Sequence, residues 1–349
     1  MSKLKSVLQN NETLFYLATL VKFSRNREFR QNVIGIHENP REIIIQKKGE
    51  LCQGTLLCRI DPVIPYGGFF AVFRRLLTGL YFSDNIGAKP YVTFSRDFIY
   101  AEKEAVNGTS EPFEYYFKPI KAVTEKEISA ANAIVEFGEK NIKMAEFMNT
   151  HDEISYKVSD EYLLEMSKIF SKYIILNDIM EEYIQSGLAE LGISAASTLA
   201  VHCRGTDFNI GSKNHPVIVT VEDYFHIIDS LLEKGYYTKI FLATDDANRL
   251  AAFEEHYGKK LCYYKDIART TGNEGLHFSE SSRINHHYQL GAEVIRDVYT
   301  MAACQGFIAG MSEVSICTRI AKRSQKIMYK DEIIIDKGIV LKGKRFSHK

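Results

Sequence analysis

The order of strands and helices in the second half of the chain constrains the fold most strongly. Short apolar segments typical of buried strands occur at residues 198–202, 239–243, 260–264 and 306–309. Segments with the apolar spacing of helices follow them, at residues 221–234, 247–257, 291–304 and 312–323. Alternating strands and helices predict a doubly wound parallel sheet that binds ligands at the carboxyl ends of its strands. We therefore expect an α/β fold with its ligand site in this half.

The first half of the chain has a less regular α/β pattern. Strands are predicted at residues 42–46 and 91–95, and an apolar helix at residues 69–82. Gly67 and Gly68 directly precede this helix. Such a pair serves either turn geometry or the close approach of a ligand to the backbone.

The length of 349 residues predicts about two domains. Charged amphipathic helices are predicted between residues 125 and 184, and the stretch 186–197 that follows is rich in small residues. We interpret this stretch as a linker, so the expected domains are residues 1–190 and 191–349.

Charge and cysteine content narrow the class of protein. The chain has 44 Lys and Arg and 44 Asp and Glu, so its net charge is zero. This balance argues against nucleic acid as a partner and allows at most peripheral membrane association. No apolar segment near the N-terminus is typical of a secretion signal or membrane span, so we expect a cytoplasmic location. Buried free thiols, rather than disulfides, are expected for the six cysteines, Cys52, Cys58, Cys203, Cys262, Cys304 and Cys317.

The first strand of the second half is followed by several polar residues. The segment His202-Cys203-Arg204-Gly205-Thr206-Asp207 places an arginine where the crevice of the sheet is expected. Arginine is always charged and binds phosphate oxygens through two N–H groups at once, so Arg204 suits a diphosphate. The alternative is an ion pair between Arg204 and Asp207 that only holds a loop.

Ser312 and Ser315 lie where the last predicted helix begins. The N–H groups and partial positive charge of a helix N-terminus suit an anion, although Ser312 can also serve as the N-cap alone. A pyrophosphate held between Arg204 and this helix end needs no metal. The ten histidines show no metal-site spacing, so we expect no metal cofactor.

Three further carboxylates are candidates for ligand binding. Asp245 and Asp246 follow the strand at residues 239–243 and can bind a divalent ion or sugar hydroxyls, or one of them caps the next helix. Asp297 lies on a mostly apolar helix. It is either solvated on the outer face of that helix or accepts hydrogen bonds from a ligand.

Together these motifs resemble the fucosyltransferase superfamily, namely the α1,6-, protein-O- and α1,2-fucosyltransferase-like enzymes that use GDP-fucose. The resemblance covers roughly residues 199–320, with α1,6-fucosyltransferases the most similar. Its motifs, in unbroken order, are Val201-His202-x-Arg204-Gly205-Thr206-Asp207, His215-Pro216, Glu222-Asp223-Tyr224, Phe241-Leu242-Ala243-Thr244-Asp245-Asp246, Gly275-Leu276-His277, Val294-Ile295-x-Asp297 and Ser312-x-x-Ser315.

The resemblance implies a GT-B-like fold with two facing α/β domains, an acceptor-side domain and a C-terminal Rossmann-like domain for the GDP-sugar. It implies an inverting, metal-independent glycosyltransferase with GDP-fucose as donor and a glycan, of the surface polysaccharide type, as acceptor. Arg204 would hold the β-phosphate, and His202 and Asp297 would read guanine. Further nucleotide contacts or support would come from Asp245, Asp246, Ser312 and Ser315.

The chain departs from this family at two places. Many relatives have a second arginine where this chain has Gly205, and residues 208–214 contain no carboxylate, whereas α1,6 enzymes have a glutamate there. The acceptor base is therefore Asp207, His215 or a residue of the first half. Other candidates on the acceptor side are His277, Gly67 and Gly68.

Two other functions fit the same motifs. A related glycosyltransferase could use another nucleotide sugar, because phosphate-binding residues do not identify the sugar. A non-catalytic protein that binds a nucleotide or a glycan could also share the fold.

Overall fold

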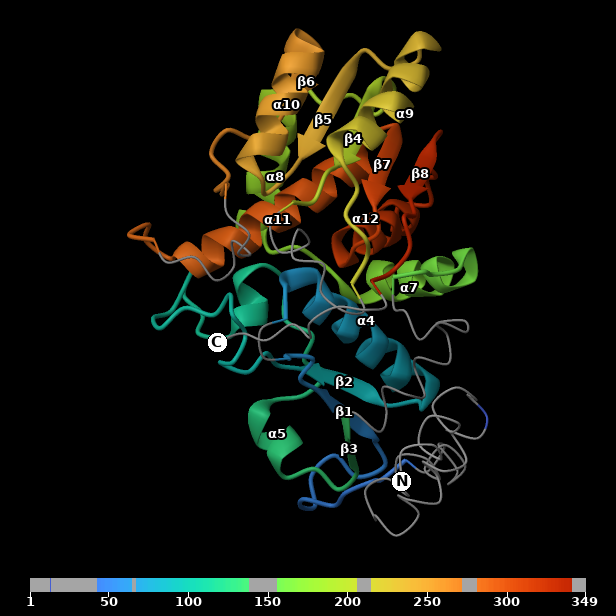
Figure 1. Cartoon of the computed structure of the whole chain (residues 1–349). Coiled ribbons are helices and arrows are strands. Elements are labelled where there is room, and N and C mark those ends of the chain that lie inside the picture. Colours follow the sequence, from blue (N-terminus) through green and yellow to red (C-terminus); the bar gives the residue numbers. More distant parts are fainter. Residues whose placement is uncertain are drawn as a thin grey trace, which may run out of the picture.

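The structure is a computed structural model that describes residue 13 and residues 43–64, 67–137, 156–205, 215–271 and 281–340. These residues form two parallel sheets, with strand orders β2-β1-β3 and β6-β5-β4-β7-β8. The two sheets lie at opposite ends of the molecule, with helices between them (Figure 1). The α/β class predicted from the sequence is confirmed.

The second sheet has the doubly wound arrangement that the sequence predicts. Its strands are β4 (Thr198–His202), β5 (Lys239–Ala243), β6 (Leu261–Cys262), β7 (Gly306–Gly310) and β8 (Glu332–Ile335). Alternate residues of a strand face opposite sides of the sheet. Leu199 and Val201 therefore pack with α9 (Val221–Glu233) and α10 (Ala247–Tyr257), while Ala200 packs with α11 (His286–Ala303) and α12 (Glu313–Ser324).

The first sheet is smaller but is also covered on both faces. It consists of β1 (Leu57–Ile60), β2 (Lys89–Val92) and β3 (Ile134–Phe137). One face packs against α4 (Phe69–Asn85), and the other against the short helix α5 (Glu125–Ser129). A 3₁₀ helix, η1 (Pro112–Tyr115), lies in the connection between β2 and α5.

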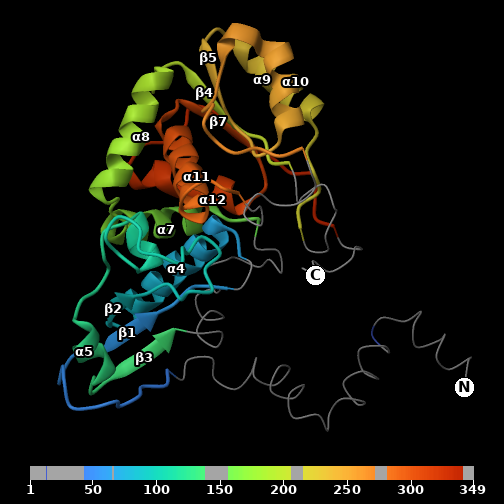
Figure 2. The ribbon, with the colours of Figure 1, turned by 90° about the vertical axis from the view of Figure 1, so that its left-hand side faces the viewer.

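One hydrophobic core connects the two sheets. It extends from the α4 face of the first sheet through α7 (Asp160–Tyr173) to the α11 and α12 face of the second. The side view shows α4, α7, α11 and α12 stacked between the sheets, with α8 (Asp178–Leu191) beside α11 (Figure 2). Among the described residues, no helix has both the length and the apolar character needed to cross a membrane.

Several predicted elements in the first half are wrong. Of the predicted strand at residues 42–46, the described part makes one bridge, from Gln46 to Ile134, and leaves Ile44 and Ile45 more than half exposed. The pairing with β3 ends at that single bridge, so the side chains of Ile44 and Ile45 remain mostly in solvent, while Ile43 packs against the core. The strand predicted at 91–95 begins earlier and is β2. Neither β1 nor β3 was predicted, and β8 of the second half was not predicted either.

The predicted linker at residues 186–197 is also wrong in its first part, because α8 continues through it to Leu191. Gly187 is one of the small residues of this stretch. In the structure, a Cβ at this position would lie 2.8 Å from the ring of Tyr264, so the glycine lets the helix pack closely. The division into residues 1–190 and 191–349 remains a prediction. The six cysteines are free thiols, as expected.

Candidate functional site

A cavity lies at the carboxyl ends of β4 and β5 and encloses about 690 Å³, its open mouth included. The sheet register explains why predicted residues meet there. His202 pairs with Ala243 across β4 and β5, so Arg204 and Asp245, each two residues further on, emerge side by side. The cavity is lined by Tyr100, His202, Arg204, Ala243, Thr244, Asp245, Ile267, Ala268, Leu290, Glu293, Val294, Asp297 and Val314.

Asp297 reaches this cavity from α11 and is half-buried, with its Oδ1 atom shielded from solvent. Its Oδ1 atom has no hydrogen-bond partner among the described residues. Burial raises the pKa of Asp297 to about 7, against the opposing effect of Arg296 and Arg269. A buried carboxylate oxygen without a partner is costly. This side chain is therefore set up to accept hydrogen bonds from a ligand, and it is not solvated on the outer face of the helix.

His202 is the last residue of β4 and is buried in the cavity wall. Burial and the nearby charge of Arg204 lower the pKa of His202 to about 4, so the imidazole is neutral at pH 7. Its Nδ1 atom lies 3.5 Å from Ser312 Oγ. Its carbonyl oxygen accepts a hydrogen bond from the Tyr224 hydroxyl at 3.0 Å. One nitrogen of a neutral imidazole is a donor and the other an acceptor, and the contact of Nδ1 with Ser312 leaves Nε2 for a polar ligand.

The structure gives the two adjacent aspartates different roles. Asp246 is the N-cap of α10 and accepts hydrogen bonds from the backbone N–H groups of Asn248 and Arg249 at 2.8 and 3.3 Å. Asp245 lines the cavity, and its Oδ1 accepts a hydrogen bond from the Gly205 N–H at 3.0 Å. Of the pair, Asp245 is thus the residue placed to contact a ligand.

Gly205 is the position at which the sequence resemblance leads us to expect a second arginine. A Cβ at this position would lie 2.4 Å from the Cβ of Asp246 and 2.5 Å from its Oδ2. The loop after β4 therefore approaches the turn after β5 too closely for any side chain at residue 205. The backbone N–H of Gly205 uses this closeness to orient Asp245.

Ser312 and Ser315 form a reciprocal cap at the start of α12. Ser315 N–H donates to Ser312 Oγ, and Ser312 N–H donates to Ser315 Oγ, both at 3.0 Å. The two hydroxyls are buried and serve the helix rather than lining the cavity. The N–H groups of Glu313 and Val314 have no acceptor within the helix. Because Val314 lines the cavity, an anion at this helix end would meet backbone N–H groups.

The remaining predicted residues that the structure describes do not line the cavity. His215 packs near Tyr156, with the two rings 6.3 Å apart. Gly67 and Gly68 precede α4, where Gly68 is the N-cap. Asp207 and His277 lie outside the described residues.

Two polar residues of the cavity wall, Glu293 and Tyr100, were not predicted from the sequence. Glu293 lies one helical turn before Asp297, a spacing of four that could have been recognised as a second carboxylate on the same face. It is paired with Arg283. Among the described residues, Tyr100 is the one that lines the cavity from the first half, and its hydroxyl accepts a hydrogen bond from the Phe69 N–H at the start of α4. No sequence motif marks Tyr100.

No group of three or more His, Cys, Asp or Glu residues that could hold a metal ion occurs within the described ranges. In the pair considered as metal ligands from the sequence, Asp246 is used by its helix cap and by Arg249, whose Nε is 3.7 Å away.

No protein-family model matches the chain, and no curated protein matches it. Among solved structures it is similar to NodZ α-1,6-fucosyltransferase soaked with GDP-fucose, with 15% identity and a TM-score of 0.44 over 76% of this chain and 91% of that one. Fucosyltransferase NodZ from Bradyrhizobium has 15% identity and a TM-score of 0.43 over 77% of this chain and 92% of that one. The structure of POFUT1 in complex with GDP-fucose has 10% identity and a TM-score of 0.44 over 82% of this chain and 99% of that one. A likeness this remote does not assign an activity to the chain.

Proposed function

We propose that this protein is a glycosyltransferase that transfers fucose from GDP-fucose to a glycan acceptor, with inversion at the anomeric carbon and without a metal. The observation that carries the proposal is the meeting of Arg204, His202 and Asp297 in one cavity at the carboxyl ends of β4 and β5. The sequence motifs that contain these residues support the same function.

Asp297 fits the guanine base. Guanine presents an N1–H group and an amino group side by side, and one ionised carboxylate can accept a hydrogen bond from each. The unpartnered Oδ1 would gain the hydrogen bond that it lacks in the free protein. Uracil and cytosine have no such donor pair, so they would leave the buried carboxylate unsatisfied. His202, neutral and adjacent, would offer a further hydrogen bond to the base.

Arg204 and the first turn of α12 fit the diphosphate. In the proposed reaction, the acceptor oxygen bonds to the anomeric carbon while the bond from that carbon to the phosphate oxygen breaks. The electron pair of the broken bond stays on GDP. Arg204 and the N–H groups of Glu313 and Val314 would stabilise this growing negative charge, which is the role that a metal plays in other transferases.

The acceptor hydroxyl must lose a proton during the attack. Asp207 is the proposed base, because the motif places it three residues after Arg204. The first half, approximately residues 1–190, is the proposed acceptor side, since Tyr100 already brings it to the cavity wall.

Binding and turnover measured together test this function. We expect the full chain to bind GDP more tightly than UDP or CMP, with and without EDTA, and to release fucose slowly from GDP-fucose. Loss of binding or turnover in EDTA would contradict the metal-independent reaction. Turnover of a different nucleotide sugar would indicate a related transferase, and binding without turnover of any donor would indicate a non-catalytic binding protein.

A further inference from the structure

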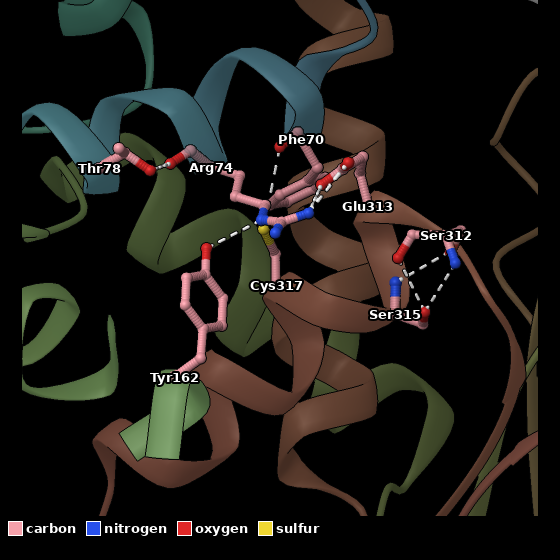
Figure 3. Close-up of polar contacts among 8 residues, drawn as sticks. All are labelled: Phe70, Arg74, Thr78, Tyr162, Ser312, Glu313, Ser315 and Cys317. Carbon is pink, nitrogen blue, oxygen red and sulfur yellow. Dashed lines mark hydrogen bonds and ion pairs between the residues drawn. The ribbon is translucent and has the colours of Figure 1, made fainter. Parts of the chain in front are cut away.

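A buried ion pair connects the first half of the chain to the helix end that faces the cavity. Arg74, on α4, donates from Nη1 to both carboxylate oxygens of Glu313 at 3.2 Å. Its Nε donates to the Tyr162 hydroxyl at 2.8 Å. Figure 3 shows Arg74 reaching from α4 between Tyr162 of α7 and Glu313 of α12. The side chains of Arg74 and Glu313 are only 7% and 20% exposed.

Glu313 occupies an unusual place for a carboxylate beside a phosphate site. It is the first residue of α12, directly after the N-cap Ser312. A carboxylate in the first turn interacts favourably with the positive end of the helix. For the same reason an unpaired Glu313 would compete with a bound phosphate for the partial charge of the helix end and would repel it.

The pairing with Arg74 removes this conflict. Both oxygens of Glu313 are held by one guanidinium, and the charge of the carboxylate is balanced by a group outside the cavity wall. Ser312 and Ser315 bond to each other on the same turn, as Figure 3 also shows. The N–H groups of Glu313 and Val314 are thus the part of the helix end that is left for an anion.

We infer that Arg74 is a positioning residue for diphosphate binding: by neutralising Glu313, it keeps the N-terminus of α12 available to the phosphates of the nucleotide. This inference rests on the proposed function, since it assumes a nucleotide diphosphate in the cavity. It assigns a residue of the first half to the donor site, although Arg74 itself does not contact the donor.

The experiment compares the affinities of the full-length chain for GDP and for guanosine. The dissociation constant for guanosine divided by that for GDP is the ratio of affinities, and it isolates the contribution of the phosphates. In Arg74→Met, a neutral side chain of similar length leaves the Glu313 charge unpaired, and we expect the ratio to fall roughly tenfold through like-charge repulsion. Arg74→Lys retains the positive charge and should retain most of the ratio.

Removing the carboxylate provides the rescue. Glu313→Gln should leave the ratio unchanged or higher, because the repelling charge is gone. The double variant Arg74→Met/Glu313→Gln should return to within about twofold of the wild-type ratio, and it contains no unpaired buried charge that would prevent folding. If Arg74 has a purely structural role, Arg74→Met should lower the melting temperature, but the ratio of affinities should neither fall in this variant nor recover in the double variant.

Arg323→Met is the matched control. Arg323 lies in the last turn of the same helix and pairs with Glu332 at 2.8 Å, with side-chain exposures of 6% and 17%. Its loss should lower the melting temperature and leave the ratio of affinities unchanged.

The outcomes separate the inference from the function on which it rests. If the wild type prefers GDP over guanosine but Arg74→Met does so equally, the inference is wrong and the proposed function stands. If Arg74→Met does not fold, a lowered ratio in Glu313→Gln or in the double variant contradicts the inference in the same way. A wild type that binds guanosine as tightly as GDP would overturn both.

Discussion

The first half satisfies the carboxylates beside its strand ends through backbone N–H groups, whereas the second half also holds a carboxylate, on α11, that is left with an open acceptor. In the first half, Asp61 directly follows β1, and its Oδ1 accepts hydrogen bonds from the Val63 and Ser95 N–H groups at 3.1 and 3.3 Å. Glu111 accepts a hydrogen bond at 2.7 Å from the Phe94 N–H, just after β2. In the second half, Asp297 lies against the cavity with one oxygen unpartnered.

Burial alone does not distinguish these carboxylates. It raises the pKa of Glu111 as it raises that of Asp297. The difference is that the backbone already satisfies Glu111, whereas Asp297 is left with an open acceptor. Among these carboxylates, an acceptor atom without a hydrogen-bond partner, more than a raised pKa, distinguishes the residue that we propose contacts the ligand.

Arg204→Lys should produce the largest effect on ligand binding. A lysine cannot make the two parallel contacts of a guanidinium with phosphate oxygens, so about 1.5–3 kcal/mol is lost, or roughly 10- to 150-fold in GDP affinity or turnover. The matched change in the first half, Arg59→Lys in β1, should leave both quantities unchanged. Calorimetry and a fucose-release assay measure them. Wild-type behaviour of Arg204→Lys would remove Arg204 from the site.

The substitutions Gly205→Ala and Gly68→Ala test how an added Cβ changes stability at one glycine near each sheet. The new Cβ at residue 205 would collide with Asp246, so we expect the free energy of unfolding to fall by about 1–3 kcal/mol. At Gly68, where φ is −60° and no atom lies within 4 Å of the new Cβ, the change should stay within about 0.5 kcal/mol. Urea denaturation of both variants checks the contrast, which would fail if the two losses were equal.

The affinity for GDP should depend on pH through Asp297. The ionised form accepts the hydrogen bonds of guanine, and the pKa of the free carboxyl is about 7. Binding below pH 7 therefore releases a proton. As the pH is lowered below 7, the affinity for GDP should fall by at most about tenfold per pH unit, and above pH 7 it should be constant. Titration of the GDP phosphate affects wild type and Asp297→Asn alike, so the difference between their pH profiles isolates Asp297. Parallel profiles would contradict the assignment.

The stability of the free protein should change in the opposite direction. The folded pKa of Asp297 is raised from 3.8 to about 7, so the folded state binds more protons than the unfolded state between these values. The contribution of Asp297 to the free energy of unfolding is therefore present at low pH and is lost as the pH rises from about 4 to about 7. Denaturation of wild type and Asp297→Asn over this range measures the difference.

Asp297→Asn should have the smallest effect among the site variants. Asparagine keeps one acceptor oxygen but loses the charge, so the preference for GDP over UDP should shrink at least several-fold, by roughly 1 kcal/mol. Glu111→Gln is the matched change in the first half, and it should leave the preference intact. An unchanged ratio in an Asp297→Asn variant that melts like wild type would mean that another residue reads the base.

Much of the second half could be predicted because its strands and helices are encoded locally. The bounds predicted for β4, β5 and α10 agree with the structure, and Ser312 is the N-cap of α12, as its position in the sequence indicates. The register of β4 and β5 then brings the predicted residues Arg204 and Asp245 together. The first half was harder because the apolar residues 43–45 have the local pattern of a strand, whereas tertiary packing pairs this segment with β3 at only one bridge, from Gln46 to Ile134.

The sequence by itself determined which chemical groups follow each strand of the second sheet, because strand periodicity and helix starts are properties of a few adjacent residues. Only the tertiary structure decided that Asp246 caps a helix while Asp245 faces the cavity. It also decided that Gly291, expected to begin a helix, lies inside α11, where a Cβ would meet the Tyr116 hydroxyl at 2.2 Å. The pair of Arg74 and Glu313 joins residues 239 positions apart. Close approaches and distant ion pairs depend on how separate elements pack, so they cannot be predicted from residues that are adjacent in the sequence.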